Sequence, residues 1–107
     1  AVLQPDAEVT VGKRAQARWD ALVGGDTKAA YEFLSPGSRA ALSLVDYASS
    51  VRVGFWRSAK VDKVTCESAD RCEVAATIEY EFQGRRTKTP LRETWIRDGS
   101  EWWYLQR

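Results

Sequence analysis

The clearest pattern in the sequence is the alternation of residue types between Cys72 and Phe82. One set of alternate positions is apolar, while the other carries Glu73, Glu79 and Glu81. Successive side chains of a strand point to opposite faces, so this pattern predicts a β-strand with one buried and one solvated face. The apolar positions are Cys72, Val74, Ala76, Ile78, Tyr80 and Phe82.

Three further strands are expected around this one, over residues 60–66, 87–97 and 101–106. Gly84 supplies one turn, and the Asp98-Gly99 pair is a typical hairpin signal. Pro90 cannot donate a ladder hydrogen bond and is expected at an edge or a bulge. The second half of the chain therefore predicts an antiparallel meander.

The first half has a helical period instead. Helices are expected over 6–23, 27–34 and 36–42, with a fourth that starts after Ser43. The apolar stripe of the first helix is expected at Val9, Lys13, Ala15, Trp19, Leu22 and Val23. Helices followed by strands predict an α+β fold, with short N-terminal helices packed on a four-stranded antiparallel sheet.

The length of 107 residues fits a single domain. Residues 1–5 are expected to form a tether, 6–52 the helical part and 59–107 the sheet. Because the chain starts at Ala1 and not at Met, we expect that a targeting segment has been removed.

Charge and composition narrow the classes of function. The 16 basic and 15 acidic residues almost balance, so no nucleic acid or anionic membrane is expected as a partner. No apolar run is long enough for a transmembrane segment. Histidine is absent, which excludes Ser-His-Asp and Cys-His catalysis in their ordinary forms. No cofactor and no metal are expected.

The two cysteines, Cys66 and Cys72, are separated by five residues. A structural zinc site needs four ligands, and a C-x-x-C redox motif has a shorter spacing. Cys66 ends one expected strand and Cys72 begins the next, so antiparallel pairing can bring them to disulfide distance. We expect a disulfide, which would indicate the periplasm or the cell exterior. Two free thiols in a cytosolic protein are the alternative.

The aromatic residues are numerous, with five tryptophans among them, and most are expected in the core. Trp102 and Trp103 are adjacent in one expected strand and must face opposite sides of the sheet. This predicts an outer face that is covered by a homodimer contact or by another protein. The candidate partner or ligand surface comprises Trp56, Trp95, Trp102, Trp103 and Tyr104.

The acidic residues have a structural and a catalytic interpretation. Glu79 and Glu81 lie opposite the apolar face and are expected to pair with the basic segment 85–88. Glu93 and Asp98 are likewise assigned to cross-strand pairs with neighbouring arginines. The remaining enzymatic candidate is Asp46 with Tyr47, for which a surface acid beside a packed ring is the favoured interpretation.

Four stretches carry a resemblance to a known family. They are "RWDALVGGDTKAAYEFLSPGSR" at 18–39, "FWRSAKVDKVTC" at 55–66, "RCEVAATIEY" at 71–80 and "ETWIRDGSEWWY" at 93–104. Together they resemble small secreted or lipid-anchored bacterial proteins of the nuclear transport factor 2-like (NTF2-like) superfamily. The resemblance implies a cone-like fold, in which helices pack into the concavity of a curved antiparallel sheet. It implies no single activity, because this superfamily includes isomerases, dehydratases, cyclases, transport adaptors and binding domains.

The function expected from the sequence is that of a non-catalytic binding or accessory domain of the bacterial cell envelope. It would recognise a protein partner or a small apolar ligand, in the periplasm or outside the cell, with a lipid anchor as an option. The alternative is a small cone-fold enzyme, of isomerase or dehydratase type, acting on an apolar carbonyl substrate. An enclosed cavity with a carboxyl group would favour the enzyme. A cone filled by Trp, Tyr and Leu would leave recognition to the surface.

Overall fold

The computed structural model describes residues 5–50 and 56–105. The four helices are α1 (Pro5–Val23), α2 (Thr27–Tyr31), α3 (Pro36–Ala41) and α4 (Leu44–Ser50). The strands are β1 (Trp56–Ser68), β2 (Arg71–Phe82), β3 (Arg85–Asp98) and β4 (Glu101–Tyr104). They form one antiparallel sheet in the order β1-β2-β3-β4. The predicted α+β fold is confirmed.

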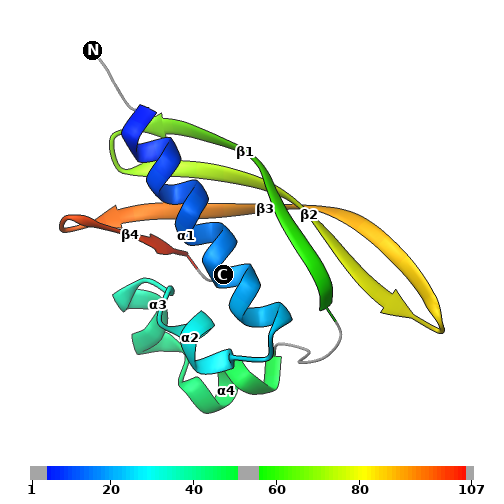
Figure 1. Cartoon of the computed structure of the whole chain (residues 1–107). Helices are drawn as coiled ribbons and strands as arrows, with labels where there is room; N and C mark the ends of the chain where they lie inside the picture. Colours follow the sequence, from blue (N-terminus) through cyan, green and yellow to red (C-terminus); the bar gives the residue numbers. More distant parts are fainter. Residues whose placement is uncertain (1–4, 51–55, 106–107) are drawn as a thin grey trace.

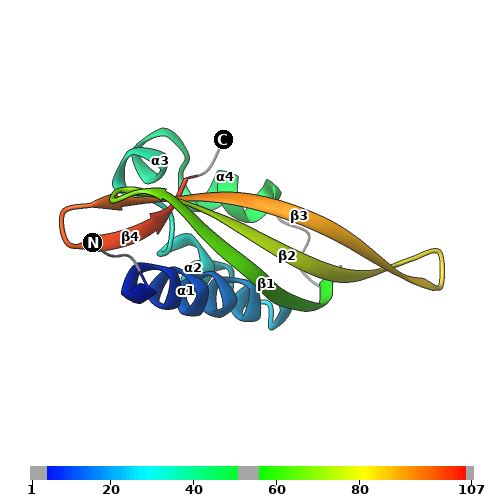
Figure 2. The same ribbon diagram turned by 90° about the horizontal axis from the view of Figure 1, so that it is seen from above.

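The sheet is twisted and curved, and α1 lies across one of its faces, while α2, α3 and α4 gather beside β4 (Figure 1). Seen from above, the β2–β3 hairpin extends well past the end of α1 (Figure 2). We call the sheet face toward α1 the inner face and the opposite one the outer face. None of the described helices is long and apolar enough to cross a membrane.

The observed elements differ from the expected ones mainly at their ends. All three long strands extend beyond their predicted bounds, and β1 already begins at Trp56. Pro5, assigned to the tether, is the first residue of α1. The rest of the expected tether, the end of the expected helical part at residues 51–52 and Gln106 lie outside the described residues.

The short helices begin at capping residues that the sequence makes recognisable. Asp26 accepts a hydrogen bond from the backbone N–H of Ala29 at 3.1 Å, and Ser35 accepts one from Ser38 at 3.1 Å. These side chains satisfy backbone donors that a helix start leaves unpaired. Gly25 has φ of +83°, a conformation that glycine adopts without the steric cost that other residues meet.

The buried face of α1 departs from the expected stripe. Val9 is 56% exposed and Lys13 is exposed, so both were assigned wrongly. Ala15, Trp19 and Leu22 are buried as expected, and Val11 and Arg18 take the remaining positions of the buried face. The buried residues of α1 are Val11, Ala15, Arg18, Trp19 and Leu22.

The alternation along β2 is confirmed over most of its length. Cys72, Val74, Ala76 and Ile78 are buried beneath the helices. Phe82 is 55% exposed, because the β2–β3 hairpin continues beyond the helices that cover the inner face (Figure 1). The expected burial of Phe82 is therefore wrong.

Both edges of the sheet are partly protected. On the β1 edge, Gln16 donates from Nε2 to the carbonyl of Ala59 at 2.8 Å and accepts from the N–H of Val61 at 2.9 Å. On the β4 edge, Tyr104 bonds through its backbone to Phe33 at 2.7 Å and Ser35 at 2.9 Å. Free strand edges promote pairing with other chains, and these contacts remove part of that template.

Cys66 and Cys72 form a disulfide across the β1–β2 hairpin. They are direct cross-strand partners, with Cα atoms 3.8 Å apart. Cys72 is fully buried and packs in the same cluster as Val11 and Trp95. The bridge thus closes the end of the hairpin on which the first turns of α1 pack.

Candidate functional site

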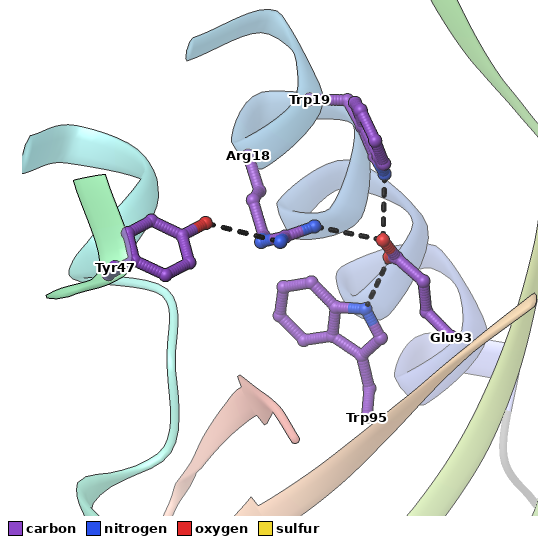
Figure 3. A network of polar contacts seen from close by, with 5 residues as sticks. All are labelled: Arg18, Trp19, Tyr47, Glu93 and Trp95. Carbon is purple, nitrogen blue, oxygen red and sulfur yellow. Dashed lines mark hydrogen bonds and ion pairs between the residues drawn. The ribbon is translucent and has the colours of Figure 1, made fainter. Parts of the chain in front are cut away.

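A buried polar network occupies the space between α1 and the inner face of the sheet (Figure 3). Its centre is the carboxylate of Glu93, which accepts hydrogen bonds from Arg18 Nη1 and from Trp19 Nε1, both at 2.8 Å. Trp95 Nε1 donates to the other carboxylate oxygen at 3.3 Å. Arg18 also donates from Nη2 to the hydroxyl of Tyr47 at 3.2 Å.

Two periodicities bring these residues together. On α1, Arg18 follows Val11 and Ala15 at spacings of seven and three residues, which places it on the buried face. On β3, Glu93 stands between Leu91 and Trp95 at alternate positions and shares their inner face. The assignment of Glu93 to a solvated cross-strand pair is therefore wrong.

This ion pair is almost completely shielded from solvent. The side chains of Arg18 and Glu93 are 5% and 2% exposed. The guanidinium group of Arg18 also stacks on the ring of Tyr104, 3.8 Å from its centroid, which adds a cation–π contact. Arg18 Nε has no hydrogen-bond partner among the described residues, so this site retains one unsatisfied donor.

The network is suited to structural support and poorly suited to proton transfer. Both oxygens of Glu93 are held by donors that belong to the protein itself, and a general base needs one oxygen in reach of a substrate proton. Breaking such a buried pair leaves an uncompensated charge, which costs about 3–5 kcal/mol. Asp46 is exposed, while Tyr47 is buried beside Arg18, so these two do not form the enzymatic pair.

The five aromatic residues assigned to a partner surface do not form one exposed surface. Trp95 is fully buried and Trp102 is 6% exposed, so both belong to the core and cannot form an outer surface. Trp56 packs edge-on against Trp19 at 5.3 Å on the inner side. Tyr104 is half-buried. The homodimer stays a prediction, and the described outer face offers it little apolar area.

Trp103 belongs to a cluster at the β4 edge. The guanidinium groups of Arg14 and Arg39 lie 5.3 and 5.2 Å from the centroid of its ring. Arg14 also lies 4.9 Å from the ring centroid of Phe33 and donates from Nε to the carbonyl of Trp102 at 2.7 Å. Burial lowers the pKa of Arg14, and the carboxylate of Glu101 partly opposes this shift.

The outer face is polar along most of its length. Glu79 pairs with Arg86 at 3.5 Å and with Lys88 at 3.6 Å, and Glu81 pairs with Arg57 at 3.0 Å. The expected ion pairs of Glu79 with the 85–88 segment are confirmed, whereas Glu81 pairs with β1. Exposed pairs of this kind contribute about 0–1 kcal/mol each.

A different arrangement occurs nearer the middle of the outer face. Lys63, Ala75 and Arg92 are direct neighbours in one row across β1, β2 and β3. A hollow of about 260 Å³ is lined by these three residues together with Thr65, Glu67, Glu73 and Val74. A second hollow of about 360 Å³ shares Glu73 and Arg92 with it. Because the side chain of Ala75 is small, the hollow opens above it, between the side chains of Lys63 and Arg92.

No cluster of three or more acidic or cysteine side chains is placed to hold a metal ion within residues 5–50 and 56–105. The residues missed at the level of sequence are Arg18 and Glu93 in the interior, and Lys63 and Arg92 outside. A signal existed for Glu93, since Leu91 and Trp95 flank it at alternate positions. For Arg18 the signal was its spacing of seven and three residues from Val11 and Ala15, which places it on the same face of the helix.

No known protein-family model matches the chain, and no curated protein matches it in sequence. Among solved structures, it is similar to a SEC-C motif containing protein from Psychrobacter arcticus, with a TM-score of 0.75 and 14% identity over 91% of this chain. The chain spans 59% of the length of that protein. A SEC-C motif containing protein from Rhodopseudomonas palustris matches 87% of this chain and 73% of its own, with a TM-score of 0.68 and 17% identity.

A third similar structure is an NTF2-like transpeptidase from Campylobacter jejuni. It matches 89% of this chain and 96% of its own, with a TM-score of 0.58 and 15% identity. At these levels of identity the likeness concerns the fold alone. The structures similar to this chain therefore include an NTF2-like protein and SEC-C motif containing proteins.

Proposed function

We propose that this chain is a non-catalytic binding domain of the bacterial cell envelope, built on the NTF2-like cone fold, which recognises a protein partner through its surface. The observation that supports this most is that both carboxylate oxygens of Glu93 already accept hydrogen bonds from the protein. Glu93 is a buried acid on the inner face, where an enzyme of this fold would need a free carboxyl group. The donors are the side chains of Arg18, Trp19 and Trp95.

Packing of the interior supports the same proposal. On the side of Glu93 that faces the helices, the space is taken by large side chains, and a small apolar ligand would have to displace them. Glu93 also contributes to the lining of the second hollow, which is bordered mainly by polar residues. Each buried aromatic ring contributes a large apolar area to the core, so such displacement is costly. The buried rings in this region are those of Trp19, Tyr47, Trp95 and Trp102.

The disulfide supports the location. Bridges such as Cys66–Cys72 persist in oxidising compartments and are rare in the bacterial cytosol. The similar structures of the C. jejuni and P. arcticus proteins come from bacteria, which fits a bacterial origin of the chain. These two points support a periplasmic or extracellular location for the proposed binding domain.

The proposal can be tested by site-specific photo-crosslinking in intact cells. A photoreactive phenylalanine derivative is placed at Thr65, exposed on the outer face, and in a second variant at Ala17, exposed on α1. We expect a crosslink to an envelope protein from position 65 and none from position 17. In parallel, protein extracted without reductant should resist labelling by a maleimide.

Two results would contradict the proposal. Recovery of the protein in the cytosol, with both cysteines labelled, would reject the envelope location. An isomerase or dehydratase activity that Glu93→Gln abolishes, in a variant with native circular dichroism, would reject the non-catalytic role.

A further inference from the structure

We infer that the row of Lys63, Ala75 and Arg92 on the outer face binds a carboxylate side chain of an acidic segment in the partner protein. This inference rests on the proposed function and adds the place and the chemistry of recognition. Lys63 and Arg92 supply the charge, and Ala75 supplies the space between them.

The sheet register sets the geometry of this site. Lys63 and Arg92 each pair with Ala75, one from β1 and one from β3. Neighbouring strands are about 4.8 Å apart, so the two cationic residues start from backbones about two strand spacings apart. Both side chains are long and exposed, and both line the hollow above Ala75. A single carboxylate seated there can meet an ammonium and a guanidinium group together, the guanidinium in bidentate form.

Lys63 and Arg92 differ from most of the charged side chains on the outer face, which take part in ion pairs. The side chain of neither residue has a hydrogen bond or an ion pair within the described part of the chain, and the same holds for the side chain of Lys60 on the neighbouring row. By contrast, Lys88 on the same face is held by Glu79 at 3.6 Å. Among the described residues, Lys63 and Arg92 therefore form a pair of unpaired cations in one row of the outer face, while Arg85 lies apart at the end of the β2–β3 hairpin.

The acids next to the hollow do not neutralise these cations. Glu73 accepts from Thr94 Oγ1 at 2.9 Å and lies 3.8 Å from Arg71. Asp62 accepts from Thr77 Oγ1 at 2.6 Å. Glu67, which also lines the hollow, lies 3.2 Å from Arg71. Within the described part of the chain none of these three acids forms an ion pair with Lys63 or Arg92, so both cations are available to an outside anion.

The same acids select the class of ligand. A continuous polyanion, such as nucleic acid or an anionic membrane surface, would meet Glu67 and Glu73 in the lining of the hollow, and the exposed Asp62 next to Lys63, as well as the cations. The formal net charge of the chain is only +1, so long-range attraction to such a surface is weak. A discrete carboxylate brings a single negative charge to the hollow and can bond to Lys63 and Arg92 together, whereas Glu67 and Glu73 in the same lining oppose a run of several negative charges. Complementarity of this kind gives specificity to protein interfaces.

The first experiment uses a short capped peptide in which glutamate alternates with serine, labelled with fluorescein, and the matched glutamine peptide. Fluorescence anisotropy at low ionic strength should show binding of the glutamate peptide alone. Lys63→Gln or Arg92→Gln should weaken it by about three- to tenfold, and the double variant should abolish it. Lys88→Gln is the control, since it removes another exposed cation of the same face that Glu79 already holds.

The second experiment places the carboxylate on the protein itself. In Ala75→Glu, the new side chain should occupy the site between Lys63 and Arg92, and the variant should lose peptide binding. Ala75→Gln is similar in size but carries no charge, and it should bind less strongly than the native protein but measurably. The melting temperature of Ala75→Glu should exceed that of Ala75→Gln, and salt should reduce this difference.

Equal effects of Lys63→Gln and Lys88→Gln, or equal melting temperatures of the two Ala75 variants, would overturn the inference. So would binding to phosphatidylglycerol vesicles or single-stranded DNA that is stronger than to the peptide, or a Lys63-dependent dimer in sedimentation equilibrium. If Thr65 still crosslinks an envelope protein while Lys63→Gln and Arg92→Gln change nothing, the proposed function stands and only this site fails.

Discussion

Removing one partner of the buried Arg18–Glu93 pair should destabilise the fold far more than removing one partner of an exposed pair. In Arg18→Met, the Glu93 carboxylate keeps its two indole donors but loses its counter-charge in a site where its side chain is 2% exposed. Single removals of this kind cost about 3–5 kcal/mol, out of a total stability of about 5–15 kcal/mol for a typical domain.

A double-mutant cycle separates the charge interaction from loss of packing. Trp19 and Trp95 donate to different oxygens of Glu93, so the amide oxygen of Glu93→Gln can accept from one of the two indoles. Arg18→Met/Glu93→Gln therefore removes both charges but leaves one acceptor. We expect the double variant to lie within about 2 kcal/mol of the native protein, because replacing both charges removes the desolvation cost as well as the attraction.

The assay is urea unfolding at 25 °C, followed by far-ultraviolet circular dichroism, because the substitutions lie next to the fluorescent indoles. With a slope of about 1–3 kcal/mol per molar urea, each single variant should lower the midpoint by at least about 1 M. The control is Arg57→Met, which breaks an exposed pair at 3.0 Å with Glu81 and should cost less than about 1 kcal/mol. Double-variant losses equal to the sum of the single losses would refute a coupled pair.

Three other variants test the disulfide, the protection of the β1 edge and the cap of α3. Cys66→Ser/Cys72→Ser should lower the unfolding free energy by about 2 kcal/mol, as expected for a bridge that closes a short loop, in urea titrations without reductant. Gln16→Leu should expose the β1 edge at Ala59 and Val61, and should raise the fraction of dimer or aggregate in size-exclusion chromatography. Ser35→Ala removes the cap of α3 and should cost about 1 kcal/mol in thermal unfolding; an unchanged melting temperature would contradict that role.

The sheet could be predicted from the sequence because its information is local. The alternation along β2, the Gly84 turn and the Asp98-Gly99 turn each lie within a few residues, and together they define the meander. The pairing of Cys66 with Cys72 was equally accessible, since only one turn separates the two strands. Helix starts at Asp26 and Ser35 were recognisable by the same local chemistry.

The interior network could be predicted only in part. The spacing along α1 and the alternation along β3 indicate that Arg18 and Glu93 face inward, although each was overlooked because charged residues are rarely buried. Their mutual contact joins positions 75 residues apart and depends on how α1 crosses the sheet. That crossing is a property of the whole fold, so no local pattern contains it.

The outer-face site could not be predicted from the sequence for a related reason. The pattern of adjacent tryptophans suggested an apolar outer surface, but Trp102 joins the core and Trp103 lies beside Arg14 and Arg39 at the β4 edge. The row that joins Lys63 to Arg92 depends on the strand register, including an irregularity in β1 between Val61 and Lys63. Such irregularities shift which side chains face each side.

The central claim is that recognition occurs on the outer face while the interior network is structural. A two-dimensional ¹H–¹⁵N NMR titration with the glutamate peptide tests both parts together, since it reports backbone amides and indole N–H groups. We expect the amide signals of Lys63, Ala75 and Arg92 to shift, while the indole signals of Trp19 and Trp95 stay in place. Movement of those two indole signals, with the amides around Ala75 unchanged, would contradict the account.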